Sequence, residues 1–257
     1  MKPDISEFSY GYALTSEFVA LHHIRGVGAP VLPSLYEEGI VGYDVHIPGI
    51  SLFLQFKLSD RMVRETASEA HLLAVPYYRM HLRSPRHSRQ HELLMALQSR
   101  GHEVYYASPE FQTSRELNCA YDGQTVAAES AFWEPNAIGP LSYDGDHYVA
   151  FHAGEAFGYV CSDPKKVPKI RHEILIGERL RPRSRSKDAA EPAPQYWRAL
   201  ANELLTIYRE KHEMPAAELR QLEETRLERE PRDDVVFLSH TLFGCALLFV
   251  PSDRHTA

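Results

Sequence analysis

The stretch that decides the fold comprises two hydrophobic runs, GYDVHI (residues 42–47) and ISLFLQFKL (residues 50–58), joined by a Pro-Gly dipeptide. Both runs are rich in β-branched, aromatic and aliphatic residues, and Pro-Gly is a strong turn signal. The stretch therefore predicts two neighbouring antiparallel strands. Asp44 lies on the first strand. Gln55 and Lys57 lie on the second and share a face, because side chains two residues apart on a strand point the same way.

Asp44, Gln55 and Lys57 bring a carboxylate, an amide carbonyl and an ammonium group to these neighbouring strands. Such a set can hold a hard divalent cation and the anion beside it, which is what phosphodiester hydrolysis requires. Gln-x-Lys alone is a common tripeptide, so its weight comes from its position after the Gly-x-Asp strand. The alternative is purely structural: Asp44 caps a turn, Gln55 is a polar edge-strand residue, and Lys57 extends to solvent at a strand end.

Hydrophobic periodicity and turn residues predict further elements on both sides of these strands. The first is an N-terminal helix over residues 6–23, with Ser6 as its N-cap. Downstream we expect a helix over 60–75, a strand over 77–82, a helix over 86–100 and a strand over 103–107.

The second half of the chain predicts a β-hairpin over 147–161 and a helical C-terminal segment. That segment contains an amphipathic helix over 196–212, a charged helix over 216–230 and a last strand over 245–250. The first of these helices carries one apolar stripe, which we expect to pack on the first domain. The stripe consists of Trp197, Leu200, Leu204, Leu205 and Tyr208.

Three parts of the chain follow from these elements. Residues 1–178 form an α/β core with the β-hairpin as an extension, and residues 196–257 form the C-terminal segment packed on it. Residues 179–195 lie between them and are rich in Arg, Ser, Ala and Pro, which is typical of a linker or an exposed loop.

The order helix–strand–strand–strand–helix–strand, with Asp44 on the first strand and Gln55-Phe56-Lys57 on the second, resembles the PD-(D/E)xK nuclease superfamily. That superfamily includes restriction endonucleases and Holliday-junction resolvases. The resemblance covers roughly residues 6–108. It implies a restriction-endonuclease-like αβββαβ core within a mixed α/β fold. Gln55 stands where the motif has an acid, as in Mrr-like restriction enzymes, so the chain is most similar to that branch.

The resemblance also implies roles for the site residues and a metal cofactor, Mg²⁺ or Mn²⁺. Asp44 would anchor the metal, Gln55 would offer its carbonyl oxygen, and Lys57 would orient or deprotonate water and neutralise charge on the phosphorane. Because a neutral amide is a weaker ligand than a carboxylate, a further acid gains importance. The family often places one on the first helix, where Glu7 and Glu17 are the candidates. They lie about 280° apart around a regular helix, so both cannot face the site, and Glu7 is favoured.

The charge distribution indicates where nucleic acid would bind. The net charge is −7, yet residues 163–187 hold nine basic residues against three acids and carry +6, which leaves −13 on the rest. This asymmetry fits either a phosphate-binding strip or a solvated linker. The candidates for nucleic-acid binding are Arg89 and Gln90 on the predicted helix over 86–100, and Lys165, Lys166, Lys169 and Arg171.

Other reactive side chains carry weaker signals. His87 and His91, four residues apart on one predicted helix, lack the third ligand that zinc requires, and we interpret them as a solvated helix face. The three cysteines are scattered and odd in number, as expected of reduced thiols in a cytoplasmic protein. The most apolar run, residues 235–250, is interrupted by polar residues and falls short of the ~20 residues of a membrane span, so we expect no membrane association.

Three functional classes remain after these observations. The leading one is a metal-dependent endonuclease acting on DNA, with RNA as the alternative substrate, for which restriction or antiviral defence is the natural setting. The second is a catalytically inactive nuclease-fold subunit that binds nucleic acid or a protein partner. The third is an interaction protein built from the charged C-terminal helices, with the first domain only as a scaffold. The partners that we expect besides nucleic acid are a second copy of the chain, in a homo-oligomer, or a partner protein from a defence system.

Overall fold

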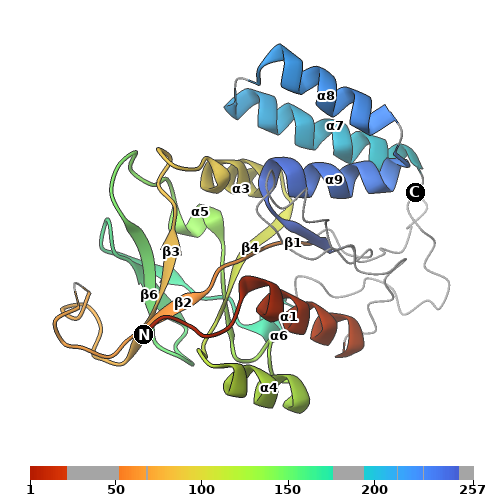
Figure 1. The fold of residues 1–257 in the computed structure, drawn as a ribbon. Coiled ribbons are helices and arrows are strands. Elements are labelled where there is room, and N and C mark those ends of the chain that lie inside the picture. The colour runs from red at the N-terminus through yellow and green to blue at the C-terminus, as the bar shows by residue number, and fades with distance from the viewer. Residues whose placement is uncertain (22–51, 68, 176–193, 213, 228, 249–257) are drawn as a thin grey trace.

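The computed structural model describes residues 1–21, 52–67, 69–175, 194–212, 214–227 and 229–248 (Figure 1). Within them the chain forms two open β-sheets with helices packed around them, a mixed α/β architecture. The predicted strand that carries Asp44 lies outside the described residues, and so does most of the predicted linker over 179–195.

The first sheet is mixed and has the strand order β5-β4-β1-β9. Its central strands, β1 (Leu52–Phe56) and β4 (Glu103–Pro109), are parallel, and Leu52 pairs with Glu103. β5 (Ser130–Trp133) is antiparallel to β4, and β9 (Ala246–Leu248) is antiparallel to β1. The strands expected at 50–58, 103–107 and 245–250 are therefore confirmed, whereas β5 was not expected.

The second sheet is antiparallel throughout and has the order β2-β3-β6-β7-β8. Its strands are β2 (Ser59–Met62), β3 (Tyr77–Leu82), β6 (His147–Phe151), β7 (Phe157–Val160) and β8 (Lys165–Pro168). The predicted hairpin is confirmed as β6 and β7. β3 is a strand, as expected, but it belongs to this second sheet, whereas β1 and β4 belong to the first. The strands of the expected core are thus divided between two sheets.

The predicted helix over 60–75 is wrong at its beginning, because Ser59–Met62 is strand β2. The Ser59 hydroxyl is buried against that of Ser108, and the backbone carbonyl of Ser59 accepts a 2.5 Å hydrogen bond from Gln112 Nε2. Further along, the buried Glu69 carboxylate accepts a 2.8 Å hydrogen bond from the Tyr77 hydroxyl on β3. Contacts with distant residues therefore replace the helix that the apolar spacing favoured.

Alternate residues of β1 face two different layers, which Figure 1 shows above and below the first sheet. Phe53 belongs to a buried cluster with α3 (Gln90–Ser99), α7 (Pro194–Lys211) and α9 (Pro231–Phe243). Its neighbours Leu52, Leu54 and Phe56 belong to a second cluster with α1 (Glu7–Leu21) and α4 (Ser114–Gly123). The strand period therefore directs Gln55 to the same layer as Phe53.

Helix α1 begins as predicted. The Ser6 hydroxyl accepts a 2.9 Å hydrogen bond from the Ser9 backbone N–H, which is the N-cap interaction. Gly11 brings the helix close to β1, because a Cβ there would lie 2.6 Å from the Phe56 ring. This close packing places Glu7, the first residue of α1, at the end of the sheet where β1 finishes.

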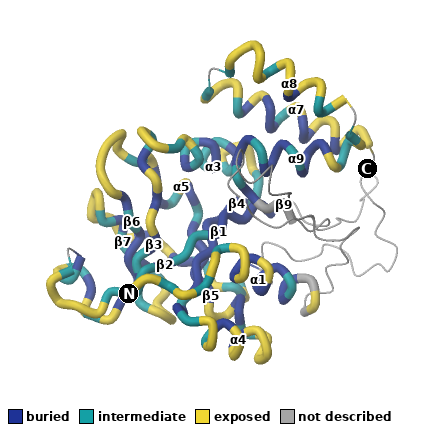
Figure 2. The backbone as a smooth tube through the Cα atoms, in the orientation of Figure 1, coloured by how far each residue is buried: buried dark blue, intermediate teal, exposed yellow. Residues whose placement is uncertain are grey.

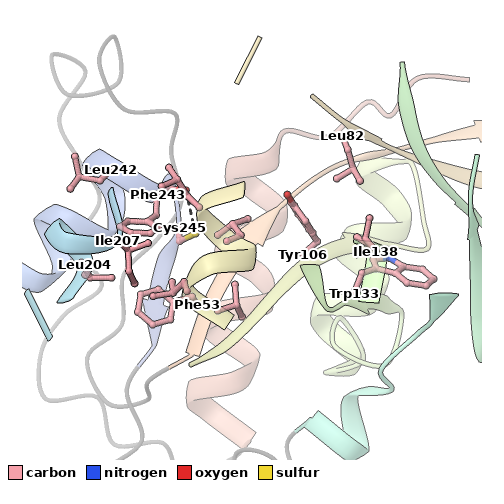
Figure 3. Close-up of a cluster of buried hydrophobic side chains, with 14 of the residues drawn as sticks. Phe53, Leu82, Tyr106, Trp133, Ile138, Leu204, Ile207, Leu242, Phe243 and Cys245 are labelled. Atoms are coloured by element: carbon pink, nitrogen blue, oxygen red, sulfur yellow. Dashed lines mark hydrogen bonds between the residues drawn. The ribbon is translucent and has the colours of Figure 1, made fainter. Parts of the chain in front are cut away.

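The apolar stripe of α7 is buried as predicted, in the same cluster as Phe53 (Figure 3). Trp197, Leu200, Leu204 and Leu205 are buried in it, and Tyr208 packs at its edge. The charged helix α8 (Ala216–Leu227) buries little beyond Leu222, so it lies at the surface, as Figure 2 shows. Sequence analysis missed α9, which Pro231 opens at its first turn and Gly244 ends in a left-handed conformation.

Candidate functional site

A pocket of about 360 Å³ lies where β1 ends, α1 and α3 begin and α9 ends. We call it the phosphate pocket, after the ligand that its charges favour. Glu7 enters it from the start of α1, Gln55 and Lys57 from the end of β1, and Arg89 and Gln90 from the start of α3. Five residues singled out in three separate parts of the sequence therefore line one pocket. Their arrangement follows from the fold, since α3 runs back along the β1–β4 pair and so begins beside the end of β1.

Residues that the sequence did not suggest complete the lining. Arg83 lies between β3 and α3, His212 follows α7, and His240 is on the last turn of α9. For Arg83 a signal existed, because it is a basic residue in the short loop that leads to the predicted helix with Arg89 and Gln90. For the two histidines no local motif existed, since they reach the pocket only through the packing of α7 and α9.

The electrostatics of the phosphate pocket favour an anion. Its described lining includes three cationic side chains, Lys57, Arg83 and Arg89, against the one carboxylate of Glu7. The amino-terminal end of α3 also lies there. Arg89 at its N-cap position provides no side-chain cap, and the Ser88 hydroxyl accepts a 3.3 Å hydrogen bond from the Gln90 backbone N–H. The backbone N–H groups and the positive dipole end at a helix N-terminus attract phosphate groups. A phosphate group therefore fits the described lining better than a bare cation does.

Gln55 is held in one orientation inside the protein. Its side chain is buried, and its Oε1 atom accepts a 2.6 Å hydrogen bond from Gln90 Nε2. Its own Nε2 donates to the backbone carbonyl of Phe56 at 3.2 Å. These two hydrogen bonds fix which end of the amide faces α3.

Arg89 joins α3 to the end of α7. Its guanidinium donates a 2.7 Å hydrogen bond to the backbone carbonyl of Lys211 and lies 3.9 Å from the Glu92 carboxylate. Burial lowers the pKa of the neighbouring His212, and the positive charge of Arg89 lowers it further. The His212 ring, stacked on Tyr208 at 4.5 Å, therefore contributes a neutral imidazole near pH 7.

Oxygen donors of the kind that Mg²⁺ prefers are present, namely the Glu7 carboxylate and the Gln55 amide oxygen. In the described part of the chain, no group of three or more His, Cys, Asp and Glu side chains is arranged to hold a metal ion. The donors fit Mg²⁺ or Mn²⁺ in chemical type, and a complete ligand set would need Asp44. The expected convergence of Asp44 with Gln55 and Lys57 stays a prediction, because Asp44 lies outside the described residues.

Glu17, the other candidate acid of α1, has a different environment. Its buried carboxylate accepts hydrogen bonds from the backbone N–H groups of Val126 at 2.6 Å and Ala127 at 3.1 Å. These bonds join α1 to the segment that follows α4. Glu17 is not among the described residues that line the phosphate pocket, so the structure brings only Glu7 to Gln55 and Lys57.

The predicted basic strip maps to β8 and the residues after it, and its described members do not line the phosphate pocket. Lys169 is buried in an ion pair with Glu110. Lys165 Nζ donates to the backbone carbonyl of Ala137 at 2.9 Å, and Lys166 Nζ lies 3.5 Å from the centre of the Phe157 ring. Arg171 is exposed at the N-cap of the short helix α6 (His172–Ile174).

The interpretation of His87 and His91 as a solvated helix face is wrong for His91, which is buried. Its Nε2 atom lies 2.8 Å from the Gly139 carbonyl oxygen, and its Nδ1 atom lies 2.9 Å from the Tyr106 hydroxyl. A carbonyl only accepts, so Nε2 carries the proton and Nδ1 accepts from Tyr106. Burial lowers the pKa of His91, and the neutral ring locks α3 onto β4.

Two further findings bear on the class of protein. Among the helices of the described residues, none has the length and apolar character needed to cross a membrane. Comparison of the chain with models of protein families, with curated proteins and with solved structures found no significant match.

Proposed function

We propose that this chain is a metal-dependent nuclease of the PD-(D/E)xK type that hydrolyses phosphodiester bonds in DNA, acting in restriction or in defence against foreign DNA. The observation that carries the proposal is the shared location of Glu7, Gln55, Lys57, Arg89 and Gln90 on one positively charged pocket. The parallel β1–β4 pair, with α1 on one face and α3 on the other, further supports a restriction-endonuclease-like core.

In this proposal the cationic side chains act on the phosphodiester. Arg83 and Arg89 hold its non-bridging oxygens, together with the N–H groups at the start of α3. The Lys57 ammonium orients the attacking water. It also neutralises the charge that develops on the phosphorane as the water oxygen bonds to phosphorus and the bond from phosphorus to the leaving oxygen breaks. Stabilising charge that appears only in the transition state raises the rate without tightening substrate binding.

The acidic and amide groups of the site would bind the metal ion. Glu7, Gln55 and Asp44 would hold Mg²⁺ or Mn²⁺, which, when bound, polarises the phosphoryl oxygen and lowers the pKa of a coordinated water. Gln90 keeps the Gln55 carbonyl oxygen in place through its 2.6 Å hydrogen bond. Because Gln55 brings no charge, the two carboxylates would carry the electrostatic part of metal binding.

The decisive experiment is a cleavage assay on the full chain with Mg²⁺ or Mn²⁺, using DNA and the base-free diester bis(p-nitrophenyl) phosphate. Wild-type chain should hydrolyse both substrates, and Lys57→Ala should lose the activity. Lys2→Ala, at the N-terminus outside the pocket lining, is the matched control and should keep it. Absence of metal-dependent cleavage by the wild-type chain would reject the proposal.

The second candidate is a nuclease-fold subunit that binds nucleic acid without cutting it. It is favoured by the excess of cationic groups over carboxylates in the described lining, and by the buried Gln55 amide whose oxygen already accepts a hydrogen bond. This candidate predicts salt-dependent DNA binding by the wild-type chain without cleavage under any metal. It also predicts that Gln55→Glu would not create metal-dependent activity.

A further inference from the structure

A second pocket of about 360 Å³ adjoins the phosphate pocket, since Arg83 lines both. Its walls are the end of β3 with the segment that follows it, and the turn that precedes β6. The polar and charged side chains that matter for its chemistry are His81, Arg83, Arg86, His87, Asp144 and Asp146.

The two walls are held together by specific contacts. The backbone N–H of Arg86 donates to the Tyr143 carbonyl at 3.3 Å, and the Arg86 guanidinium pairs with Asp144 at 3.2 Å. Within the turn, the Ser142 hydroxyl donates to the Asp144 carbonyl at 2.9 Å. Gly145 has φ +104°, a conformation that strains any side chain, so the turn that presents Asp146 depends on glycine.

The chemistry of the second pocket differs from that of the phosphate pocket. Its two arginines are matched by two aspartates, so it has no excess of positive charge for a phosphate group. A ligand that fits must offer hydrogen-bond donors to a carboxylate and acceptors to a guanidinium. Guanine does both, because its N1–H and amino group donate side by side while O6 and N7 accept. Adenine and cytosine lack this pairing of two adjacent donors with two adjacent acceptors.

His81 supplies an aromatic surface at the same pocket. Its ring packs on Tyr148 at 5.1 Å between centroids, and the Arg79 guanidinium lies 4.2 Å from the centre of the Tyr148 ring. Burial lowers the pKa of His81, so its ring is neutral near pH 7. A neutral ring held in this way can stack on a nucleobase.

We propose that the second pocket binds the guanine base of the nucleotide next to the phosphate held in the phosphate pocket. Asp146 accepts from the guanine N1–H and amino group, because Asp144 is already paired with Arg86. Arg83 lies between base and phosphate, and His81 stacks on the ring. The inference rests on the proposed function for its substrate class and adds that the base is read while unpaired, in a single strand or flipped out of a duplex.

The test measures binding by fluorescence anisotropy of the full chain without divalent cations. The probes are labelled single-stranded thymidine oligonucleotides with one central guanine, adenine or hypoxanthine; hypoxanthine lacks only the amino group. The wild-type chain should bind the guanine probe at least about fivefold more tightly than the other two. Asp146→Asn should remove this preference. Asp122→Asn, an exposed aspartate on α4 outside both pockets, is the matched control and should keep it.

Equal binding of the three probes by the wild-type chain, or no binding of any, would overturn the inference. So would a guanine preference that survives in folded Asp146→Asn. The wild-type comparison of guanine with hypoxanthine needs no variant, so it decides the matter even if Asp146→Asn does not fold. The proposed function is tested separately with bis(p-nitrophenyl) phosphate, a substrate without a base. If the chain does not hydrolyse it with a divalent metal, the proposed function fails, whatever the result with the guanine probe.

Discussion

Two basic regions of this molecule differ both in sequence and in structure. At the phosphate pocket, Lys57, Arg83 and Arg89 come from separate parts of the chain and line one cavity, whose described lining has a single carboxylate. On β8 and just after it, Lys165, Lys166 and Lys169 are clustered in sequence, yet each contacts another group of the protein. The density of lysine and arginine along the sequence therefore does not locate an anion site. An anion site is instead located where several cationic side chains line the same pocket.

The largest effect that tests this comparison is expected at Lys169. The substitution Lys169→Ala removes the ion-pair partner of the buried Glu110 carboxylate. Among the described residues, Glu110 then keeps the hydrogen bond from the Gly154 backbone N–H, at 2.8 Å. Removing one partner of a buried ion pair typically lowers the free energy of unfolding by about 3–5 kcal/mol. Chemical denaturation measures this change. A loss below about 1 kcal/mol would mean that Lys169 is not committed to the fold and is available to bind nucleic acid.

Lys57→Ala should have the largest effect on catalysis. Loss of one electrostatic contact in the transition state typically costs about 10²–10³ in rate, whereas KM for DNA should change little. Because Lys57 is only partly buried, the free energy of unfolding should change by about 0.5 kcal/mol or less. Steady-state kinetics with Mg²⁺ gives both constants. A rate unchanged in Lys57→Ala would place the chemistry elsewhere and remove the contrast between the two regions.

Gln55→Glu tests whether the pocket also holds a cation. Without metal, the variant loses the hydrogen bond to the Phe56 carbonyl and places a negatively charged carboxylate beside that carbonyl oxygen. This change should lower the free energy of unfolding by about 1–3 kcal/mol. If Gln55 is a ligand, added Mg²⁺ should raise the thermal midpoint of the variant more than that of the wild type. Gln221→Glu, on the exposed side of α8, is the matched control. An identical Mg²⁺ response in all three chains would argue for an anion site without a metal.

The salt dependence of DNA binding compares the two regions directly. Each phosphate contact contributes about 0.9 to the slope of log K against log salt on duplex DNA. Arg83→Ala should lower the magnitude of the slope by about that amount, whereas Lys165→Ala should leave it unchanged. Anisotropy titrations over a range of salt concentrations give the slope. If Lys165→Ala lowers it as much as Arg83→Ala does, β8 takes part in binding.

The smallest effect is expected at Lys166. Its ammonium lies over the Phe157 ring at an exposed position, and such an interaction contributes about 0.5–1 kcal/mol. Lys166→Ala should lower stability by no more than this and leave DNA cleavage unchanged. Thermal unfolding and the cleavage assay check both parts. A marked loss of cleavage would show that the strip on β8 acts on the substrate.

Sequence reasoning worked best where local pattern and final packing agree. The α1 helix with its Ser6 cap, strands β1, β3 and β4, the β6–β7 hairpin and the buried stripe of α7 all follow from periodicity and capping residues. It failed at β2, where apolar spacing favoured a helix but buried hydrogen bonds from distant residues favour a strand. It also missed α9, because an apolar run of that length does not reveal whether it forms a helix or a strand.

For the site, the sequence by itself supplied the chemical groups: a Gln-x-Lys pair fixed to one face by the strand period, an acid on the first helix, and polar residues at the start of the next helix. Only the tertiary structure decided which of them meet. It brings Glu7 to the pocket and commits Glu17 to backbone N–H groups, and it adds Arg83, His212 and His240. The physical reason is the distance along the chain over which each effect acts. Strand and helix periods orient side chains over a few residues, whereas the meeting of β1 with α1, α3, α7 and α9 depends on which apolar faces the whole chain can bury together.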